Sequence, residues 1–177
     1  MTTRSRALGA GWNDILRALA GFRGVGRRFQ LVGEAAGAVV IDDYAPHPTE
    51  LAAALRAARG MYEGRRLVAV FQPHLFSRTR DFARGFGEAL AVADKVWLTD
   101  IFPAREAPIP GVDGQTLVTA AKEAGARDVS YVDALDHLAS AIAADTREGD
   151  LILTLGAGSI EHTGEALLGM LAEPAHA

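Results

Sequence analysis

From about residue 37 onward, the chain alternates between two kinds of hydrophobic segment. The first kind is a short apolar run rich in β-branched residues, which is typical of a strand buried on both faces. Such runs lie at residues 38–41, 67–71, 96–99 and 151–155, and a weaker one lies at residues 128–132. These segments are therefore predicted to be strands.

The second kind of segment is longer, rich in alanine, and has apolar residues at the three- and four-residue spacing of a helix face. Such segments lie at about residues 49–59, 82–93, 117–124, 135–142 and 159–171. The alternation predicts an α/β, Rossmann-like fold, with a mostly parallel open sheet and helices on both faces. Ligands of such sheets bind beyond the carboxyl ends of the strands, so the loops after residues 41, 71, 99 and 155 are expected to form the site.

The first thirty residues follow a different pattern. Residues 12–22 have the apolar spacing of one amphipathic helix, and residues 24–32 are interpreted as a turn that leads into a strand. This segment is interpreted as the end of a preceding domain. Because the chain has 177 residues, a single domain is expected after it.

Composition excludes several classes of protein. A hydrophobic fraction of 49% and a charged fraction of 23% are typical of a globular chain rather than a disordered one. A net charge of −4 without a basic block argues against nucleic-acid and membrane partners. The absence of cysteine excludes disulfides and fits a reducing compartment. The opening residues lack the apolar core of a signal peptide, so a cytoplasmic protein is expected.

The loop after the first predicted strand contains the sequence Asp42-Asp-Tyr-Ala-Pro-His-Pro-Thr-Glu50. Carboxylates at such a strand end can accept hydrogen bonds from ribose hydroxyls. A solvated strand end explains Asp42 and Asp43 equally well, so both interpretations stay open. Thr49 is predicted to cap the helix that follows, since threonine is a favoured cap and prolines mark helix entries.

The loop after the second predicted strand has the sequence Phe71-Gln-Pro-His-Leu-Phe-Ser-Arg-Thr-Arg80. Its His74, Ser77, Arg78 and Arg80 cluster where a strand gives way to a helix. Cations at a helix start interact unfavourably with the helix dipole. An anion bound there would interact favourably with both the dipole and the arginines. We therefore expect an anion beside Arg78. The alternative is that Ser77 caps the helix and the arginines lie in solvent.

Two further loops carry weaker signals. The segment 100–113 contains three prolines and is long for a connection, which favours a binding loop with Arg105 and Glu106 as candidates, although a surface ion pair explains them equally well. The sequence Gly156-Ala-Gly-Ser159 allows close backbone approach to a ligand, but such turns also serve packing. The sequence contains no Gly-x-x-x-x-Gly-Lys-Ser/Thr loop, no complete dinucleotide fingerprint and no metal-ligand cluster.

Considered in order, these loops resemble successive motifs of the Mur ligases. The matching segments are Gly24–Gln30, Asp42–Glu50, Phe71–Arg80, Glu106–Gly111 and Leu155–Gly158. The string Gln72-Pro-His-x-x-Ser-Arg-Thr79 resembles the branch of the family that joins L-alanine to UDP-N-acetylmuramate. The resemblance covers the chain from about residue 12.

The resemblance implies an ATP- and Mg²⁺-dependent ligase that works through an acyl phosphate in peptidoglycan precursor synthesis. It implies that residues 1–25 are a remnant of a central ATPase domain and that residues 26–177 are the C-terminal domain. The expected partners are UDP-N-acetylmuramate, L-alanine, ATP and the central and N-terminal ligase domains that this chain lacks. The chain alone is expected to be inactive, because phosphate and metal contacts come mainly from those domains.

The resemblance also assigns site residues. Arg28 is expected to contact ATP, Asp43 is expected at the ATP ribose, and Arg28 and Arg78 are expected to stabilise charge during catalysis. The residues expected on the substrate side of the cleft are Tyr44, His47, His74 and Arg78, with Arg78 as a carboxylate clamp. No metal ligand is expected in this chain.

Two positions depart from the family pattern. Pro46 replaces the first of two adjacent histidines, and Leu75 stands where relatives often have a basic residue. Alternative interpretations are a free-standing nucleotide or amino-acid binding module and a decayed ligase fragment. A nicotinamide-dependent oxidoreductase is disfavoured by the missing dinucleotide fingerprint.

Overall fold

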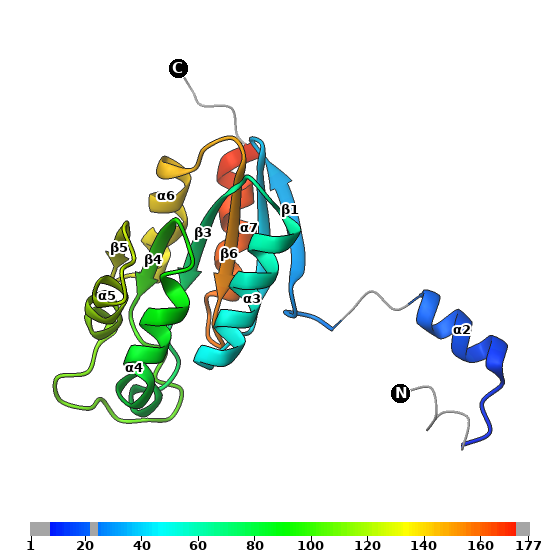
Figure 1. Ribbon diagram of the computed structural model, residues 1–177, viewed down its shortest axis with the longest axis horizontal. Coiled ribbons are helices and arrows are strands. Elements are labelled where there is room, and N and C mark those ends of the chain that lie inside the picture. The colour runs from blue at the N-terminus through cyan, green and yellow to red at the C-terminus, as the bar shows by residue number, and fades with distance from the viewer. Residues whose placement is uncertain (1–7, 22–24, 173–177) are drawn as a thin grey trace.

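The computed structural model describes residues 8–21 and 25–172 (Figure 1). Its sheet has six strands in the order β1-β2-β6-β3-β4-β5. The strands are β1 (Gln30–Ala35), β2 (Ala38–Asp43), β3 (Arg66–Phe71), β4 (Lys95–Thr99), β5 (Val129–Val132) and β6 (Asp150–Leu155). The helices are α2 (Trp12–Ala20), α3 (Pro48–Met61), α4 (Phe76–Leu90), α5 (Gly114–Glu123), α6 (Leu135–Asp145) and α7 (Glu161–Ala172).

Strands β2 to β6 pair in parallel, and only β1 pairs in the antiparallel direction, with β2 at one edge of the sheet. The turn between β1 and β2 places Ala36 at φ 48° and Gly37 at φ 77°, the positive values that a tight hairpin turn of two residues requires. The predicted mostly parallel α/β sheet is confirmed. The strand expected within residues 24–32 begins only at Gln30 and continues to Ala35.

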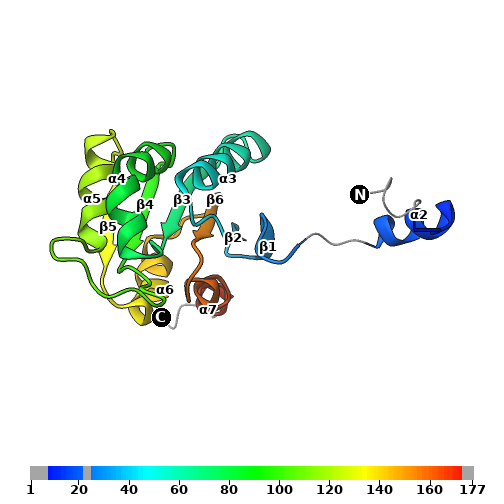
Figure 2. The same ribbon diagram turned by 90° about the horizontal axis from the view of Figure 1, so that it is seen from below.

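The helices cover the two faces of the sheet (Figure 2). One buried core lies between the sheet and α3, α4 and α5, and a second core lies between the sheet and α6 and α7. Because β6 inserts between β2 and β3, every residue of β2 and β6 is buried. This position explains why both segments are mainly apolar, whereas the edge strand β5 is only half-buried.

The parallel strands place the loops after β2, β3, β4 and β6 at one edge of the sheet, the lower edge in Figure 1. This placement confirms that the four predicted loops lie together at the carboxyl ends of the strands. We call this edge, with its loops, the carboxyl edge. The opposite edge, where β3, β4 and β6 begin, is the amino edge.

Helix α2 lies before the sheet domain in the chain and apart from it in Figures 1 and 2. It is shorter than the predicted helix 12–22, whose last residue lies outside the described residues, as does Gly24 of the first motif. Ile15 is buried, while Leu16 and Leu19 leave about half of their surface exposed. Within the described ranges, no helix is both long and apolar enough to cross a bilayer.

Candidate functional site

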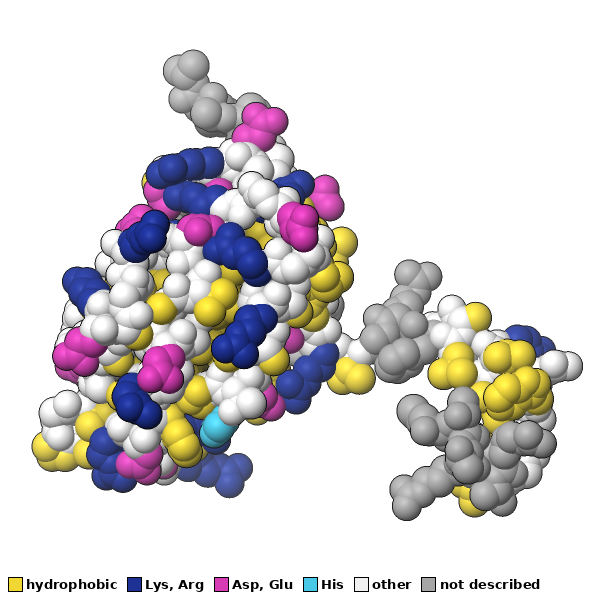
Figure 3. Space-filling view, in the orientation of Figure 1, with side chains coloured by type: hydrophobic (Ala, Val, Ile, Leu, Met, Phe, Trp, Pro, Cys, Tyr) yellow, Lys and Arg dark blue, Asp and Glu magenta, His cyan; other side chains and the backbone are white. Residues whose placement is uncertain are grey.

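The candidate site is at the carboxyl edge, where several polar segments that are far apart in sequence meet. In Figure 3, arginine or lysine, acidic, apolar and histidine side chains are exposed near the lower end of the sheet domain. The residues that the sequence predicted are Arg28, Asp43, Tyr44, His47, His74 and Arg78, and all lie in or beside the first two loops of this edge. Their contacts show which of them stay available to a ligand.

Asp42 and Asp43 are the last residues of β2, and only 5% and 8% of their surfaces are exposed. The Asp42 carboxylate accepts hydrogen bonds from Thr154 Oγ1 at 2.8 Å and from Arg27 Nε at 2.7 Å. The Asp43 carboxylate accepts from the backbone N–H groups of Phe29 at 2.8 Å and Ala45 at 3.1 Å. The interpretation of a solvated strand end is therefore wrong, because both carboxylates are buried and hydrogen-bonded.

The entering segment 25–29 is fixed to the sheet by Arg27, which the sequence analysis did not single out. Besides Asp42, its guanidinium donates to Gly156 O at 2.6 Å and lies 3.0 Å from a Glu161 oxygen. Arg27 and Phe29 both have positive φ, 57° and 48°, a costly conformation for residues with a side chain. Arg27 therefore ties this segment to β2, to the loop after β6 and to the start of α7. Its only signal in the sequence was its place beside Arg28.

Arg28 makes different contacts from Arg27. Its guanidinium lies 5.7 Å from the centre of the Tyr44 ring and 3.7 Å from a Glu50 oxygen, and about half of the side chain is exposed. Tyr44 is itself exposed and lies beneath both Arg27 and Arg28. The structure thus brings an accessible cation and an accessible aromatic ring together beside Asp43.

His47, and not Thr49, caps helix α3. Its Nδ1 accepts from Thr49 N at 3.3 Å, while the Glu50 side chain accepts from His47 N at 3.2 Å. The predicted cap at Thr49 was wrong because Pro48 starts the helix, which places Thr49 inside the first turn. The His47 ring also packs edge-on against Phe82, with the ring centres 4.9 Å apart.

His74, on the β3–α4 connection, and Arg78, in the first turn of α4, lie next to each other. Arg78 Nη1 lies 3.3 Å from His74 Nδ1 and donates to the carbonyl of Pro46 at 3.4 Å. Burial lowers the pKa of His74, the charge of Arg78 lowers it further, and Glu106 opposes them. A neutral His74 can then accept from Arg78. Pro46 lacks the side chain of the usual histidine, but its backbone carbonyl still anchors Arg78.

Helix α4 begins in an unexpected way. Its cap residue Leu75 has no side-chain hydrogen bond and a φ of 73°, and Ser77 does not cap the helix. Instead, Ser77 N donates to Glu106 at 3.0 Å, and Ser77 Oγ donates to the same carboxylate. The predicted anion position at this helix start is therefore filled by a carboxylate of the chain itself. Glu106 is thereby bound to Ser77, which favours neither a surface ion pair with Arg105 nor direct ligand binding by Glu106, the two interpretations left open by the sequence.

The turn after β6 is shaped by packing within the protein. A Cβ added at Gly156, whose φ is 135°, would lie 2.6 Å from Gln72 O, and one at Gly158 would lie 2.5 Å from Gln72 Oε1. Gln72 Oε1 also accepts from Ile160 N at 3.0 Å. The glycines therefore allow the loops after β3 and β6 to pack closely against each other, which favours the packing alternative over close approach of a ligand.

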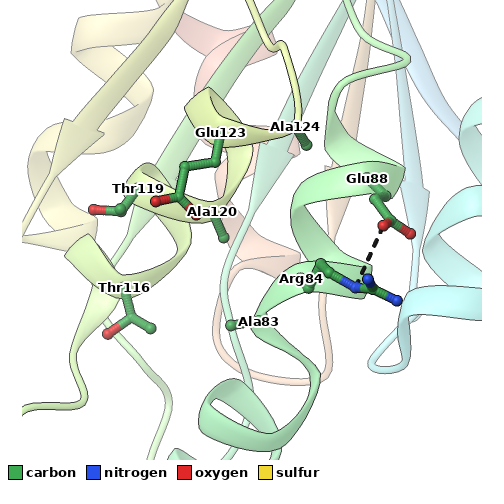
Figure 4. Close-up of a pocket in the computed structure, with 8 residues that line it drawn as sticks. All are labelled: Ala83, Arg84, Glu88, Thr116, Thr119, Ala120, Glu123 and Ala124. Atoms are coloured by element: carbon green, nitrogen blue, oxygen red, sulfur yellow. Dashed lines mark ion pairs between the residues drawn. The ribbon is translucent and has the colours of Figure 1, made fainter.

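Hollows lie beside these loops and between the helices. One of about 400 Å³ is lined by Arg28, Phe29 and Gln30 among others. Two others differ from it in their lining. One, of about 230 Å³, is lined by Arg27, Gln30, Val32, Asp42, Glu161, His162 and Glu165. A larger groove of about 520 Å³ runs between α4 and α5, where Ala83 and Ala120 form the floor and the Arg84–Glu88 pair lies on the rim (Figure 4). This groove is lined by none of the predicted site residues. Within residues 8–21 and 25–172, no group of three or more His, Asp or Glu side chains is placed to hold a metal ion.

The chain is similar to known proteins along most of its length. It is 53% identical to the UDP-N-acetylmuramate–L-alanine ligase of Cutibacterium acnes over 93% of this chain and 35% of the relative. It is 52% identical to the ligase of the same name from Oleidesulfovibrio alaskensis over 86% of this chain and 34% of the relative. The chain therefore spans about a third of the length of these relatives.

Comparison with solved structures agrees. The crystal structure of a UDP-N-acetylmuramate-alanine ligase from Thermotoga maritima matches with a TM-score of 0.75 and 28% identity, over 94% of this chain and 35% of that one. The family model described as "Mur ligase, glutamate ligase domain" matches residues 27–158, which is well over half of the chain and includes the site residues described above. The chain belongs to the Mur ligase family, as a copy of this domain.

Proposed function

We propose that this chain is the C-terminal domain of a cytoplasmic ligase that joins L-alanine to UDP-N-acetylmuramate with ATP. The observation that carries the proposal is the high identity to ligases of that name along nearly the whole chain. In this proposal, residues 1–25 end the central ATPase domain, and residues 26–177 form the domain that closes over it. The chain alone is catalytically silent because it spans only about a third of those relatives.

The nucleotide side of the proposed cleft is formed by Arg28 and Asp43. Arg28 is accessible and positively charged, as a residue that contacts ATP phosphates must be. Asp43 is held in one orientation by two backbone N–H groups, and each carboxylate oxygen keeps a further lone pair for a ribose hydroxyl. In this proposal Mg²⁺, which would neutralise phosphate charge, is held mainly by the central domain.

The amino-acid side is formed by Tyr44, His47, His74 and Arg78. The hydrogen-bond partners of Arg78 among the described residues are neutral, namely the Pro46 carbonyl and His74, so its charge is left for a substrate carboxylate. A planar guanidinium suits a carboxylate because it can donate two parallel hydrogen bonds. Arg78 would thus hold L-alanine with its amine directed at the acyl phosphate, and Arg28 would face the developing negative charge.

A mixing experiment tests the proposal. The chain is combined with the two missing domains of the Cutibacterium acnes relative and supplied with ATP, Mg²⁺, UDP-N-acetylmuramate and L-alanine, and phosphate release is recorded. We expect release that depends on both the chain and L-alanine, and none from the chain alone. An Arg84→Ala variant, altered on the exposed surface of α4, serves as the control that retains activity.

Other outcomes would favour the alternatives. Turnover by the chain alone would contradict the proposal that catalysis needs the other two domains. ATP or L-alanine binding without turnover on mixing would favour a free-standing binding module. Neither binding nor turnover, despite association with the other domains, would favour a decayed fragment.

A further inference from the structure

The long loop 100–113 is held across the start of helix α4. Phe102 N donates to Pro73 O at 2.8 Å, and Leu75 N donates to Phe102 O at 3.0 Å. These bonds form an isolated parallel bridge between His74 and Phe102, whose rings stack with their centres 5.7 Å apart. The loop therefore covers one side of the segment that carries His74 and Arg78.

The first turns of α4 depend on this loop. Phe82 has non-helical angles of −117° and 16°, so the helix is kinked there, and residues 76–81 form a separate helical piece. The cap residue Leu75 supplies no side-chain acceptor, and the Glu106 carboxylate accepts from both the N–H and the hydroxyl of Ser77. An acceptor that stands 29 residues away thus replaces the local cap that a helix start usually has.

We propose that Glu106 is a positioning residue of this site, whose grip on Ser77 holds loop 100–113 closed and fixes Arg78 and His74 for the amino-acid substrate. The inference rests on the proposed function for the role of Arg78. It assigns no substrate contact to Glu106 itself. The hydrogen bonds from Ser77 lower the pKa of Glu106, so the carboxylate is ionised at neutral pH and acts only as an acceptor.

The same contacts keep Glu106 from neutralising Arg78. A carboxylate this near an arginine would ordinarily form a salt bridge with it and occupy the guanidinium. Here each Glu106 oxygen accepts from Ser77, and Arg78 turns instead toward Pro46 O and His74. The contact between Glu106 and Ser77, called the Glu106 clamp below, therefore orders the residue next to Arg78. It leaves the Arg78 guanidinium without a hydrogen-bonded carboxylate partner among the described residues.

The pKa of His74 reports whether the clamp holds the loop. Burial is the main cause that lowers it, whereas the charge of Glu106 raises it. If Glu106 acted only as a nearby charge, Glu106→Gln would lower the His74 pKa further. If Glu106 holds the loop closed, the same change exposes His74 to water, and the pKa rises toward the ordinary value of about 6.5.

The first experiment is therefore an NMR titration of His74 in the chain itself. We expect Glu106→Gln to raise the pKa of His74, and Ser77→Ala to raise it by less while keeping the Glu106 charge. Glu123→Gln, an exposed carboxylate of α5, is the matched control and leaves the value unchanged. An unchanged or lowered His74 pKa in both clamp variants, with the fold intact by thermal unfolding, would overturn the proposal.

The second experiment uses the mixed enzyme described above. We expect Glu106→Gln to raise the KM for L-alanine about tenfold while the KM for ATP stays within about twofold, because one lost positioning hydrogen bond corresponds to roughly 1.4 kcal/mol. An equal rise in both KM values would contradict a role in placing Arg78. Absence of turnover with the unaltered chain would count against the proposed function, while the titration would still decide whether the clamp exists.

Discussion

The two edges of the sheet carry charged side chains in different states. At the amino edge, Arg66 donates to both oxygens of Asp150, at 2.9 and 2.8 Å, and also reaches Asp145 at 3.2 Å. At the carboxyl edge, the Pro46 carbonyl and His74 are the hydrogen-bond partners of Arg78 among the described residues, and Arg28 lies half-exposed, 3.7 Å from Glu50.

This difference separates charges that hold the fold together from charges that can bind a ligand. Asp150 is 1% exposed and is the main cause that raises the pKa of Arg66, so each ion offsets the burial of the other. Arg78 and Arg28 retain hydrogen-bond donors that an anionic ligand can use. Arg66 thus serves stability at the amino edge, as Arg27 does through Asp42 at the carboxyl edge, whereas Arg78 and Arg28 are available for recognition.

The largest effect that would test this comparison is expected at the amino edge. Asp150→Ala removes both Asp150 acceptors of the partly buried Arg66 guanidinium, which keeps only its contacts to Asp145, and the acceptor of the Arg147 N–H. It should lower the free energy of unfolding by about 3–5 kcal/mol. Urea unfolding measures the loss. Asp81→Ala removes an exposed pair with Arg80 and should change stability by less than about 1 kcal/mol. Equal effects of the two variants would remove the distinction between paired and surface charges.

The next effect belongs to the carboxyl edge and should appear in activity. Arg78→Ala in the mixed enzyme should lower kcat/KM for L-alanine about 30- to 1,000-fold, equivalent to about 2–4 kcal/mol, because a substrate carboxylate loses its charged partner. The free energy of unfolding should change by less than about 1 kcal/mol, since the lost contacts are to neutral groups at 3.3 and 3.4 Å. A large loss of stability would place Arg78 with the structural charges instead.

A third prediction concerns the close packing of the loops beneath the site. Gly156→Ala should destabilise the fold by about 1–3 kcal/mol, because its φ of 135° is strained for alanine and the new Cβ would lie 2.6 Å from Gln72 O. Gly169→Ala in α7 is the matched control, since a Cβ there meets nothing within 4 Å, and it should stabilise by up to about 1 kcal/mol. Thermal unfolding of both variants measures the difference, and a neutral Gly156→Ala would show that the turn relaxes.

The smallest effect is a dependence of stability on pH. Because the pKa of His74 is lowered in the fold, the unfolded chain binds more protons just below the unfolded pKa of about 6.5. The contribution is fully present above that value and decreases as pH falls through it, until the folded His74 also protonates. Urea unfolding between pH 5 and 7.5 should therefore show a smaller loss at low pH in His74→Gln. Identical pH profiles would contradict a partly buried, neutral His74.

The features predicted from the sequence and those added by the structure differ in how far apart along the chain the interacting residues lie. Strands β3 and β6 and helices α3 and α6 could be predicted because burial on both faces or on one face leaves a local pattern. The cap at His47 and the role of Glu106 were missed because local preference favoured Thr49 and Ser77, while the start of α3 at Pro48 and the loop 100–113 decided otherwise. Arg27 was missed because its partners at Asp42, Gly156 and Glu161 are distant in sequence.

The sequence by itself determined the order of strands and helices along the chain, the edge of the sheet where the candidate loops lie and the motifs that relate the chain to its family. Hydrophobic spacing and loop composition are local properties, so they can be recognised from the sequence alone. Only the tertiary structure decided which polar groups are already occupied: Asp42 by Arg27 and Glu106 by Ser77, while Arg78 and Arg28 stay available. Such pairing depends on distances between segments that only folding brings together, and for that reason no spacing along the chain encodes it.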